Sequence, residues 1–176
     1  KIKGFDHLKR LSLCMVDLDN VTFERMMLSC QQIEILKISY CDFDDEYAQY
    51  FDVPDLANLR KLTVELNYIQ SLILHEAPNL ESLFCSSNED FMRDIGDWAP
   101  CWLDLCSSQY KNLKILVLYA VGHCYKVLIQ MEHKFPCLED STFQYCQDFK
   151  RINIKSDSLK KIQFSDNWGL HKAQFD

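Results

Sequence analysis

Histidine and cysteine are the side chains in this sequence that could carry catalysis or bind a metal. The candidates are His75, His123, His133, Cys101, Cys106, Cys124 and Cys137. A cysteine beside a histidine can act as a nucleophile, and the same two residue types bind zinc. His123 and Cys124 are adjacent, and His133 and Cys137 form an H-x-x-x-C pair, but the chain has no C-x-x-C pair. These spacings match no familiar zinc module, so we expect no metal site.

Catalysis would also require a cleft, an oxyanion hole and a third group that orients the histidine. The chain has only 4 glycines and neither a G-x-S-x-G nor a G-x-x-x-x-G-K-[ST] motif, which excludes loops that cradle phosphate. We therefore expect no enzymatic activity and no cofactor. A small hydrolase with a Cys–His pair is the alternative, and rapid labelling of Cys124 or Cys137 near neutral pH would support it.

A repeated pattern, L-x-x-L-x-L, describes the elements that would position these residues. Its copies, in which other side chains replace some leucines, begin at Leu8, Ile33, Leu59, Ile69, Leu80, Leu113, Leu138, Phe149 and Leu159. The first three begin at residues 8, 33 and 59, so the steps between them are 25 and 26 residues long. Leucine-rich repeats recur every 20–29 residues or so, and each contributes one short strand to a solenoid.

We predict an α/β fold, a leucine-rich-repeat solenoid with one curved parallel β-sheet and an irregular convex side of helices and turns. One domain should span residues 1–176, with an insertion at about 88–110. The insertion accounts for the longest step between copies, from Leu80 to Leu113. Because the chain begins at Lys1, without an initiator methionine and directly before the first repeat, we expect it to be a fragment of a longer protein.

The convex side should contain helices in the longer repeats and none in the shorter ones. Helices are expected at 20–30, 42–51 and 123–135, and in the insertion around Trp102 to Cys106. The residues of the first helix expected to face the core are Val21, Phe23, Met27 and Leu28. Asn20 would cap that helix. The copies at Ile69 and Phe149 are followed by the next copy after 11 and 10 residues, which leaves no room for a three-turn helix.

The concave side is the predicted binding surface. In each strand the second and third apolar positions should face the core, and the residues beside them should face outward. The residues that we expect to bind a partner protein are Ile73, His75, Phe84, Val117, Tyr119, Arg151, Lys155 and Lys161. Ile73, Phe84 and Val117 would stack on successive strands, with His75 and Tyr119 beside them. Exposed apolar clusters with aromatic members mark interaction sites, unless the insertion or further repeats cover them.

Basic residues gather on the last strands of this face. Arg151, Lys155 and Lys161 would lie close together, and in a chain of formal net charge -7 they would attract an acidic ligand or peptide. The alternative is that these side chains are simply solvated. The acidic character of the whole chain argues against a nucleic-acid partner, because phosphate binding needs a basic face.

The apolar runs and the cysteines indicate in which cellular compartment the protein is expected. No run approaches the roughly 18 apolar residues of a membrane span, and the first residues, KIKGFDHLKR, contain no apolar signal region. The 9 cysteines are odd in number, and Cys41 and Cys146 occupy positions where leucine-rich repeats turn the chain with a small buried side chain. We therefore expect free thiols and a reducing location, the cytoplasm, the nucleus or both.

Four segments resemble the leucine-rich-repeat portion of plant F-box proteins, a class that often also carries an FBD segment. They are LSCQQIEILKISYC (28–41), HEAPNLESLFCSSN (75–88), YKNLKILVL (110–118) and KFPCLEDSTFQYC (134–146). The resemblance implies substrate recognition for an SCF-type (cullin) ubiquitin ligase, in which an F-box binds a Skp-type adaptor and the repeats hold the protein substrate. Residues 1–176 contain no F-box, so the resemblance assigns adaptor binding to no residue here. The same repeat pattern occurs in plant intracellular immune receptors, and the sensor region of such a receptor is the alternative.

Overall fold

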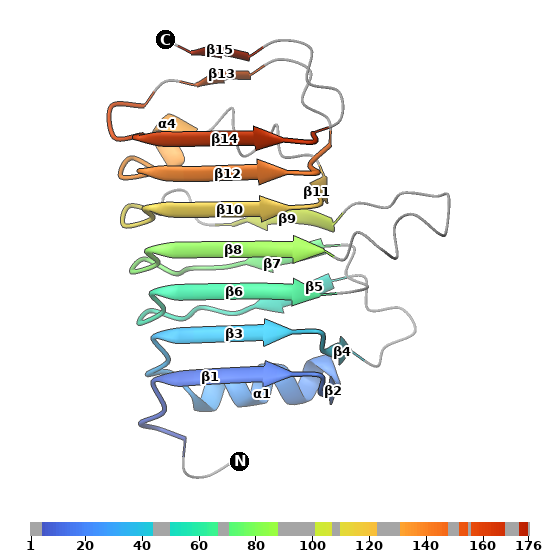
Figure 1. The fold of residues 1–176 in the computed structure, drawn as a ribbon. Helices are drawn as coiled ribbons and strands as arrows, with labels where there is room; N and C mark the ends of the chain where they lie inside the picture. Colours follow the sequence, from blue (N-terminus) through green and yellow to red (C-terminus); the bar gives the residue numbers. More distant parts are fainter. Residues whose placement is uncertain are drawn as a thin grey trace, which may run out of the picture.

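The structure of the chain is a computed structural model. It describes residues 5–43, 50–66, 71–87, 101–106, 110–122, 131–147, 152–154, 156–167 and 173–175. Within these residues, parallel strands stack in a front layer and a back layer, and the chain winds from one layer to the other (Figure 1). This is the predicted leucine-rich-repeat solenoid.

The front layer is a seven-stranded parallel sheet. Its strands, in spatial order, are β1 (Arg10–Cys14), β3 (Ile35–Ser39), β6 (Lys61–Leu66), β8 (Ser82–Ser87), β10 (Ile115–Tyr119), β12 (Asp140–Gln144) and β14 (Lys161–Ser165). The register places equivalent positions of the repeat opposite one another, so that Leu36, Leu62, Leu83 and Leu116 form one fully buried line. The second apolar position of the pattern therefore faces the core, as predicted.

The back layer also consists largely of strands. A four-stranded parallel sheet contains β11 (Val121–Gly122), β9 (Cys101–Leu105), β7 (Ser71–Leu74) and β5 (Tyr50–Val53), in that order. Two smaller parallel pairs are β2 (Asp17–Leu18) with β4 (Asp42–Phe43) and β13 (Ile152–Ile154) with β15 (Ala173–Phe175). Figure 1 shows β7 and β9 behind the front strands.

The predicted helix at 20–30 is confirmed as α1 (Asn20–Ser29). Its N-cap is Asp19 rather than Asn20, because the Asp19 carboxylate accepts a hydrogen bond of 2.7 Å from the Thr22 backbone N–H. Phe23 and Met27 are buried as predicted. The exposed Val21 and Leu28 instead face solvent, because they lie on the other side of the helix. Neither described helix is long and apolar enough to cross a membrane.

Two other helix predictions are wrong for the residues that the structure describes, because these form strands. Of the segment predicted to be helical at 42–51, residues 42–43 form β4, residues 50–51 begin β5, and residues 44–49 lie outside the described part; Cys101–Leu105 forms β9. In β5, Phe51 and Val53 are buried and Tyr50 and Asp52 are exposed, which is the two-residue period of a strand. Neighbouring parallel strands satisfy the backbone of both segments, and this tertiary context outweighs local preference. In the third predicted helix, residues 131–134 form α4 (Met131–Lys134) and residues 123–130 lie outside the described part.

The repeat count also differs from the prediction. The copies of the pattern at Ile69 and Phe149 contribute β7 and β13, which lie outside the front sheet. A step of 10 or 11 residues covers only half a turn of the solenoid, so the next strand falls in the opposite layer. The other copies contribute the seven front strands, and each full turn uses one of them.

Aromatic rings pack together behind the front sheet. The ring centroids of Phe23 and Phe51 are 4.8 Å apart, and Phe43 lies 4.8 Å from Phe51. Full burial of one phenylalanine contributes about 1.5–3 kcal/mol. Tyr110 is also buried, and its hydroxyl donates a hydrogen bond of 2.9 Å to the backbone carbonyl of Leu74 in β7. These contacts join α1, β4 and β5 to one another and tie β7 to the turn that precedes β10.

Cysteines pack inside the turns that follow the front strands. Cys41 and Cys146 are buried, as predicted, and the Cys146 thiol donates to the Leu118 carbonyl at 3.4 Å. The cysteines that the structure describes as free thiols are Cys14, Cys30, Cys41, Cys85, Cys106, Cys137 and Cys146.

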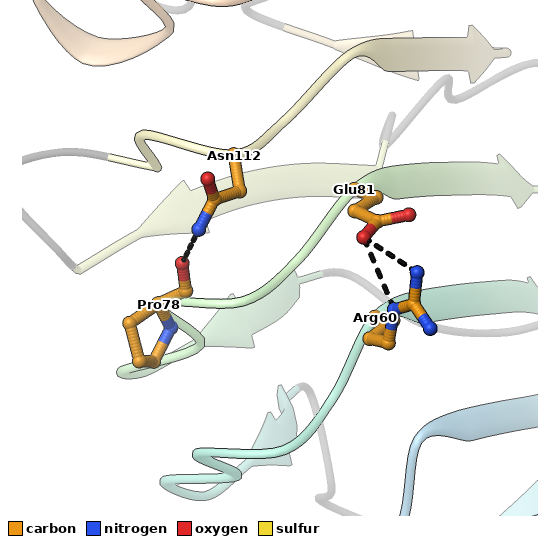
Figure 2. A network of polar contacts seen from close by, with 4 residues as sticks. All are labelled: Arg60, Pro78, Glu81 and Asn112. Atoms are coloured by element: carbon orange, nitrogen blue, oxygen red, sulfur yellow. Dashed lines mark hydrogen bonds and ion pairs between the residues drawn. The ribbon is translucent and has the colours of Figure 1, made fainter.

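A row of charged residues, which we call the charged rim, lies at the N-terminal ends of the front strands, one residue immediately before each strand. Its residues alternate in sign: Lys9, Glu34, Arg60, Glu81, Lys114, Glu139 and Lys160. Lys9 and Glu34 are 2.7 Å apart, and both Nε and Nη2 of Arg60 donate to Oε1 of Glu81 (Figure 2). Opposite charges on adjacent turns therefore support the register of the front sheet.

A ladder of asparagine side chains lies beside the charged rim. Asn112 Nδ2 donates to the Pro78 carbonyl of the preceding turn at 2.9 Å (Figure 2), and Asn79 and Asn58 make the equivalent bonds one and two turns earlier. Each bond satisfies a carbonyl that the turn before the strand leaves without a sheet partner.

The chain leaves several front strands through residues with positive φ. They are Met15, Tyr40, Ala120, Tyr145 and Asp166, with φ between 52° and 54°. This left-handed conformation costs an L-residue roughly 1–2 kcal/mol, and asparagine tolerates it better than methionine or tyrosine. The corner geometry of the solenoid therefore imposes local strain.

Replacing Met15 by asparagine should raise the free energy of unfolding by about 0.5–1 kcal/mol, because Met15 is 77% exposed and loses little packing when replaced. Denaturant unfolding measures the change. As a matched control, Leu28→Asn on the exposed side of α1 should lower stability slightly, because φ is negative there and asparagine is a poorer helix former. A loss of stability in Met15→Asn would contradict the strain argument.

The charged rim predicts a pH dependence of stability. The hydrogen bond and charge of Lys9 lower the pKa of Glu34. Because the folded pKa lies below the unfolded one, this pair stabilises the protein above the ordinary carboxyl pKa of about 4.3, and the contribution is lost as pH falls through the folded pKa. Glu34→Gln should therefore reduce the loss of stability on acidification, measured by denaturant unfolding at neutral and acidic pH. Lys9→Gln should give the same reduction, and an unchanged pH profile in both variants would contradict the pair.

Candidate functional site

The outward-facing residues of the front strands form one continuous surface, which we call the ladder face. Its first row is Arg10, Ile35, Lys61, Ser82, Ile115, Asp140 and Lys161. Its second row is Ser12, Lys37, Thr63, Phe84, Val117, Thr142 and Gln163. Its third row is Cys14, Ser39, Glu65, Ser86, Tyr119, Gln144 and Ser165, of which Ser39 is buried beneath its neighbours. With strands about 4.8 Å apart, each row is about 29 Å long.

The centre of the ladder face is apolar. Phe84 and Val117 lie opposite each other in the second row, and both are half-buried. Ile115 is 44% exposed, and the half-buried Tyr119 packs edge-on against Tyr145 with ring centroids 5.2 Å apart. The structure thus brings together Phe84, Val117 and Tyr119, as predicted, and adds Ile115. We call Phe84, Ile115, Val117 and Tyr119 the apolar patch.

The predicted positions of Ile73 and His75 on this face are wrong. Ile73 lies in β7 of the back sheet, in register with Asp52 of β5 and Asp104 of β9. His75 follows β7, and its Nε2 lies 2.9 Å from Oδ1 of Asp52. The half-turn step from Ile69 to Leu80 is the reason, because it puts every residue of β7 in the back layer.

Of the predicted basic cluster, Arg151, Lys155 and Lys161, the structure describes only Lys161. Arg151 and Lys155 lie outside the described residues, so their role as binding residues stays a prediction. Lys161 is on the first row of the ladder face, where its Nζ lies 3.5 Å from Oδ2 of Asp140. A carboxylate of the same face therefore offsets part of its charge.

Cations at the other end of the ladder face were not singled out by sequence reasoning. Arg10 and Lys61 lie in the first row and are exposed, and Lys37 lies between them in the second row. Lys37 Nζ is 3.4 Å from Glu65 Oε2, and the Ser39 hydroxyl donates to the same oxygen at 2.5 Å. Strand alternation in the sequence places all of these side chains at outward positions, but only the structure shows which charges are paired.

An open cavity lies where α1 meets the back sheet. It has a volume of about 510 Å³, and its walls include Val21 and Phe23 of α1 and Asp52, Asp55 and His75 of the back layer. No sequence signal could have revealed it, because it depends on α1 packing beside β5.

The candidate nucleophiles do not form a catalytic arrangement in the described residues. His123 and Cys124 lie outside them, and Cys137 and His133 are exposed. The pKa of the Cys106 thiol is raised, first by desolvation and then by the carboxylates of Asp104 and Asp52, whereas reactive thiols have a lowered pKa. Among the side chains that the structure describes, no group of three or more histidines, cysteines or acids is placed to hold a metal ion.

Comparison with known proteins supplies the family. No curated protein and no solved structure matches the chain. The family model described as "FBD-associated F-box protein At5g56370, LRR repeats" matches residues 2–95. This match covers more than half of the 176 residues and agrees with the parallel solenoid. Leucine-rich repeats of this kind are generally protein-interaction modules, which suits the broad ladder face. The chain therefore belongs to the leucine-rich-repeat family of the FBD-associated F-box protein At5g56370.

Proposed function

We propose that this chain recognises the protein substrate of an SCF-type (cullin) ubiquitin ligase and has no catalytic activity of its own. The family match carries this proposal, because an F-box protein couples a Skp-type adaptor to a substrate-binding region. In the proposal the repeats bind the substrate. The adaptor binds an F-box, which residues 1–176 do not contain, in another part of the full-length protein.

The apolar patch is the proposed centre of the substrate site. It lies on regular strands, so its side chains are held by the backbone of the sheet and lose little freedom on binding. Phe84 and Tyr119 are aromatic, and such residues at the centre of a contact surface commonly supply most of the binding energy. The polar residues around the patch, such as Thr63 and Thr142, are suited to the rim of an interface.

An intracellular location and a protein rather than nucleic-acid partner complete the proposal. The free thiols support a reducing compartment, the cytoplasm or the nucleus. The net charge of -7 favours a protein partner over DNA or RNA. The family match names an F-box protein, so it favours this function over the sensor region of an immune receptor.

Substituting Phe84 by aspartate in the full-length protein should weaken substrate capture at least 30-fold or so, because it places a charge at the centre of the contact. Capture is measured by quantitative affinity purification from cells in which cullin ligases are blocked. The captured proteins must also be ubiquitinated in a reaction that requires the Skp-type adaptor.

The control is Leu28→Asp, on a residue of α1 that is 58% exposed and lies away from the ladder face, and it should leave capture unchanged. Circular dichroism and thermal unfolding establish whether Phe84→Asp folds. If it does not, Ile115→Asp tests the same patch at a more exposed position. Normal capture by a folded patch variant, or captured proteins that are never ubiquitinated, would refute the proposed function.

A further inference from the structure

We propose that the ladder face binds an extended acidic peptide segment of its partner, with the pattern acidic-x-x-acidic-x-x-apolar. The two acidic side chains would lie over Arg10 and Lys61, and the apolar one over Ile115 and the apolar patch. The inference rests on the proposed function and deepens it, because it names the chemistry of the substrate segment.

The ladder face has more cations than it can neutralise itself. Its two carboxylates are already engaged: Glu65 lies 3.4 Å from Lys37 and accepts a hydrogen bond from Ser39, and Asp140 lies 3.5 Å from Lys161. Four cations, Arg10, Lys37, Lys61 and Lys161, therefore stand against two carboxylates on this face. The remaining positive charge must therefore be met by solvent, by counterions or by a partner.

Arg10 and Lys61 are these remaining cations. Both are exposed, and neither forms an ion pair within the part of the chain that the structure describes. The rim carboxylates Glu34 and Glu81 pair with the rim cations Lys9 and Arg60 at 2.7 and 2.8 Å, and the charge of Arg10 contributes only as a minor cause to the lowered pKa of Glu34. An excess of positive charge on one face of an acidic chain favours association with a carboxylate-bearing partner.

The distance between alternate strands in the first row matches the repeat of a peptide in the polyproline II conformation. Arg10, Lys61 and Ile115 lie on β1, β6 and β10, which are alternate strands of the front sheet. Alternate strands are about 9.6 Å apart. A polyproline II segment has three residues per turn and rises about 9.3 Å in one turn, so every third side chain projects from the same side. Such a segment lying across the strands would place three side chains over Arg10, Lys61 and Ile115.

The positions between these three residues suit the intervening residues of the peptide. Ile35 on β3 and Ser82 on β8 are only partly exposed, so they project less from the face than Arg10, Lys61 and Ile115 and leave room for the peptide backbone. At the apolar end, Ile115 is 44% exposed and stands beside Val117 and Phe84. An aliphatic side chain placed there would bury apolar surface that water otherwise covers.

The test measures binding of a fluorescent peptide, Glu-Pro-Ala-Glu-Pro-Ala-Leu, to the 176-residue chain by anisotropy. A peptide of the same composition with adjacent glutamates, and one with glutamines in place of glutamates, serve as controls. We expect the first peptide to bind most tightly and to weaken with rising salt. Arg10→Ala and Lys61→Ala should each reduce its affinity about two- to five-fold, the range of exposed ion pairs.

The matched control is Lys161→Ala, which removes a cation from the same row whose charge Asp140 already offsets, and it should change the affinity less than two-fold or so. Ile115→Asp should abolish binding. The inference is overturned if the peptide does not bind, if either control peptide binds as tightly, or if Lys161→Ala weakens binding as much as Lys61→Ala.

The two proposals fail in different ways. If the peptide fails while Phe84→Asp still loses a ubiquitinated substrate, the substrate-recognition function stands and the acidic-segment inference is wrong. If the peptide binds as expected but no captured protein is ubiquitinated with the Skp-type adaptor, the acidic-segment chemistry stands and the ligase role is wrong.

Discussion

In-register parallel pairing of the front strands is the constraint on which the other features of this molecule depend. Each of the five inner front strands takes its backbone partners from the turns before and after it, so a register error would spread to both neighbours. A slip of one residue would turn Leu36 or Leu62 outward and a polar neighbour into the core, which makes the aligned register strongly preferred. The same register arranges the ladder face in straight rows.

The form of the back layer follows from the spacing of apolar residues in each turn. A turn with enough chain and an apolar helical face, as at Phe23 and Met27, forms α1. Turns with a two-residue period, as at Phe51 and Val53, add strands to a second sheet that stacks beside the first. Because both layers bury apolar side chains against each other, Phe51 and Leu72 contribute to the same core as Leu62.

Charge on the ladder face depends on pairing between turns. The rim and the face contain both signs, and most carboxylates contact a cation on an adjacent turn, as Glu65 contacts Lys37. These pairs support the register, and on the ladder face they leave Arg10 and Lys61 as the cations available to a partner. An acidic protein can in this way present a locally basic strip beside an apolar patch, which combines attraction at a distance with burial at contact.

Local spacing in the sequence determined the repeat family, the inward line of Leu36, Leu62 and Leu116, and the helix at α1, because strand and helix periods are properties of neighbouring residues. It also determined that Phe84 and Val117 face outward together. Only the tertiary structure decided that the copy at Ile69 belongs to the back sheet, which removes Ile73 and His75 from the binding face. The physical reason is that a strand's layer and a side chain's ion pair depend on the turns packed beside it, and no local pattern contains that information.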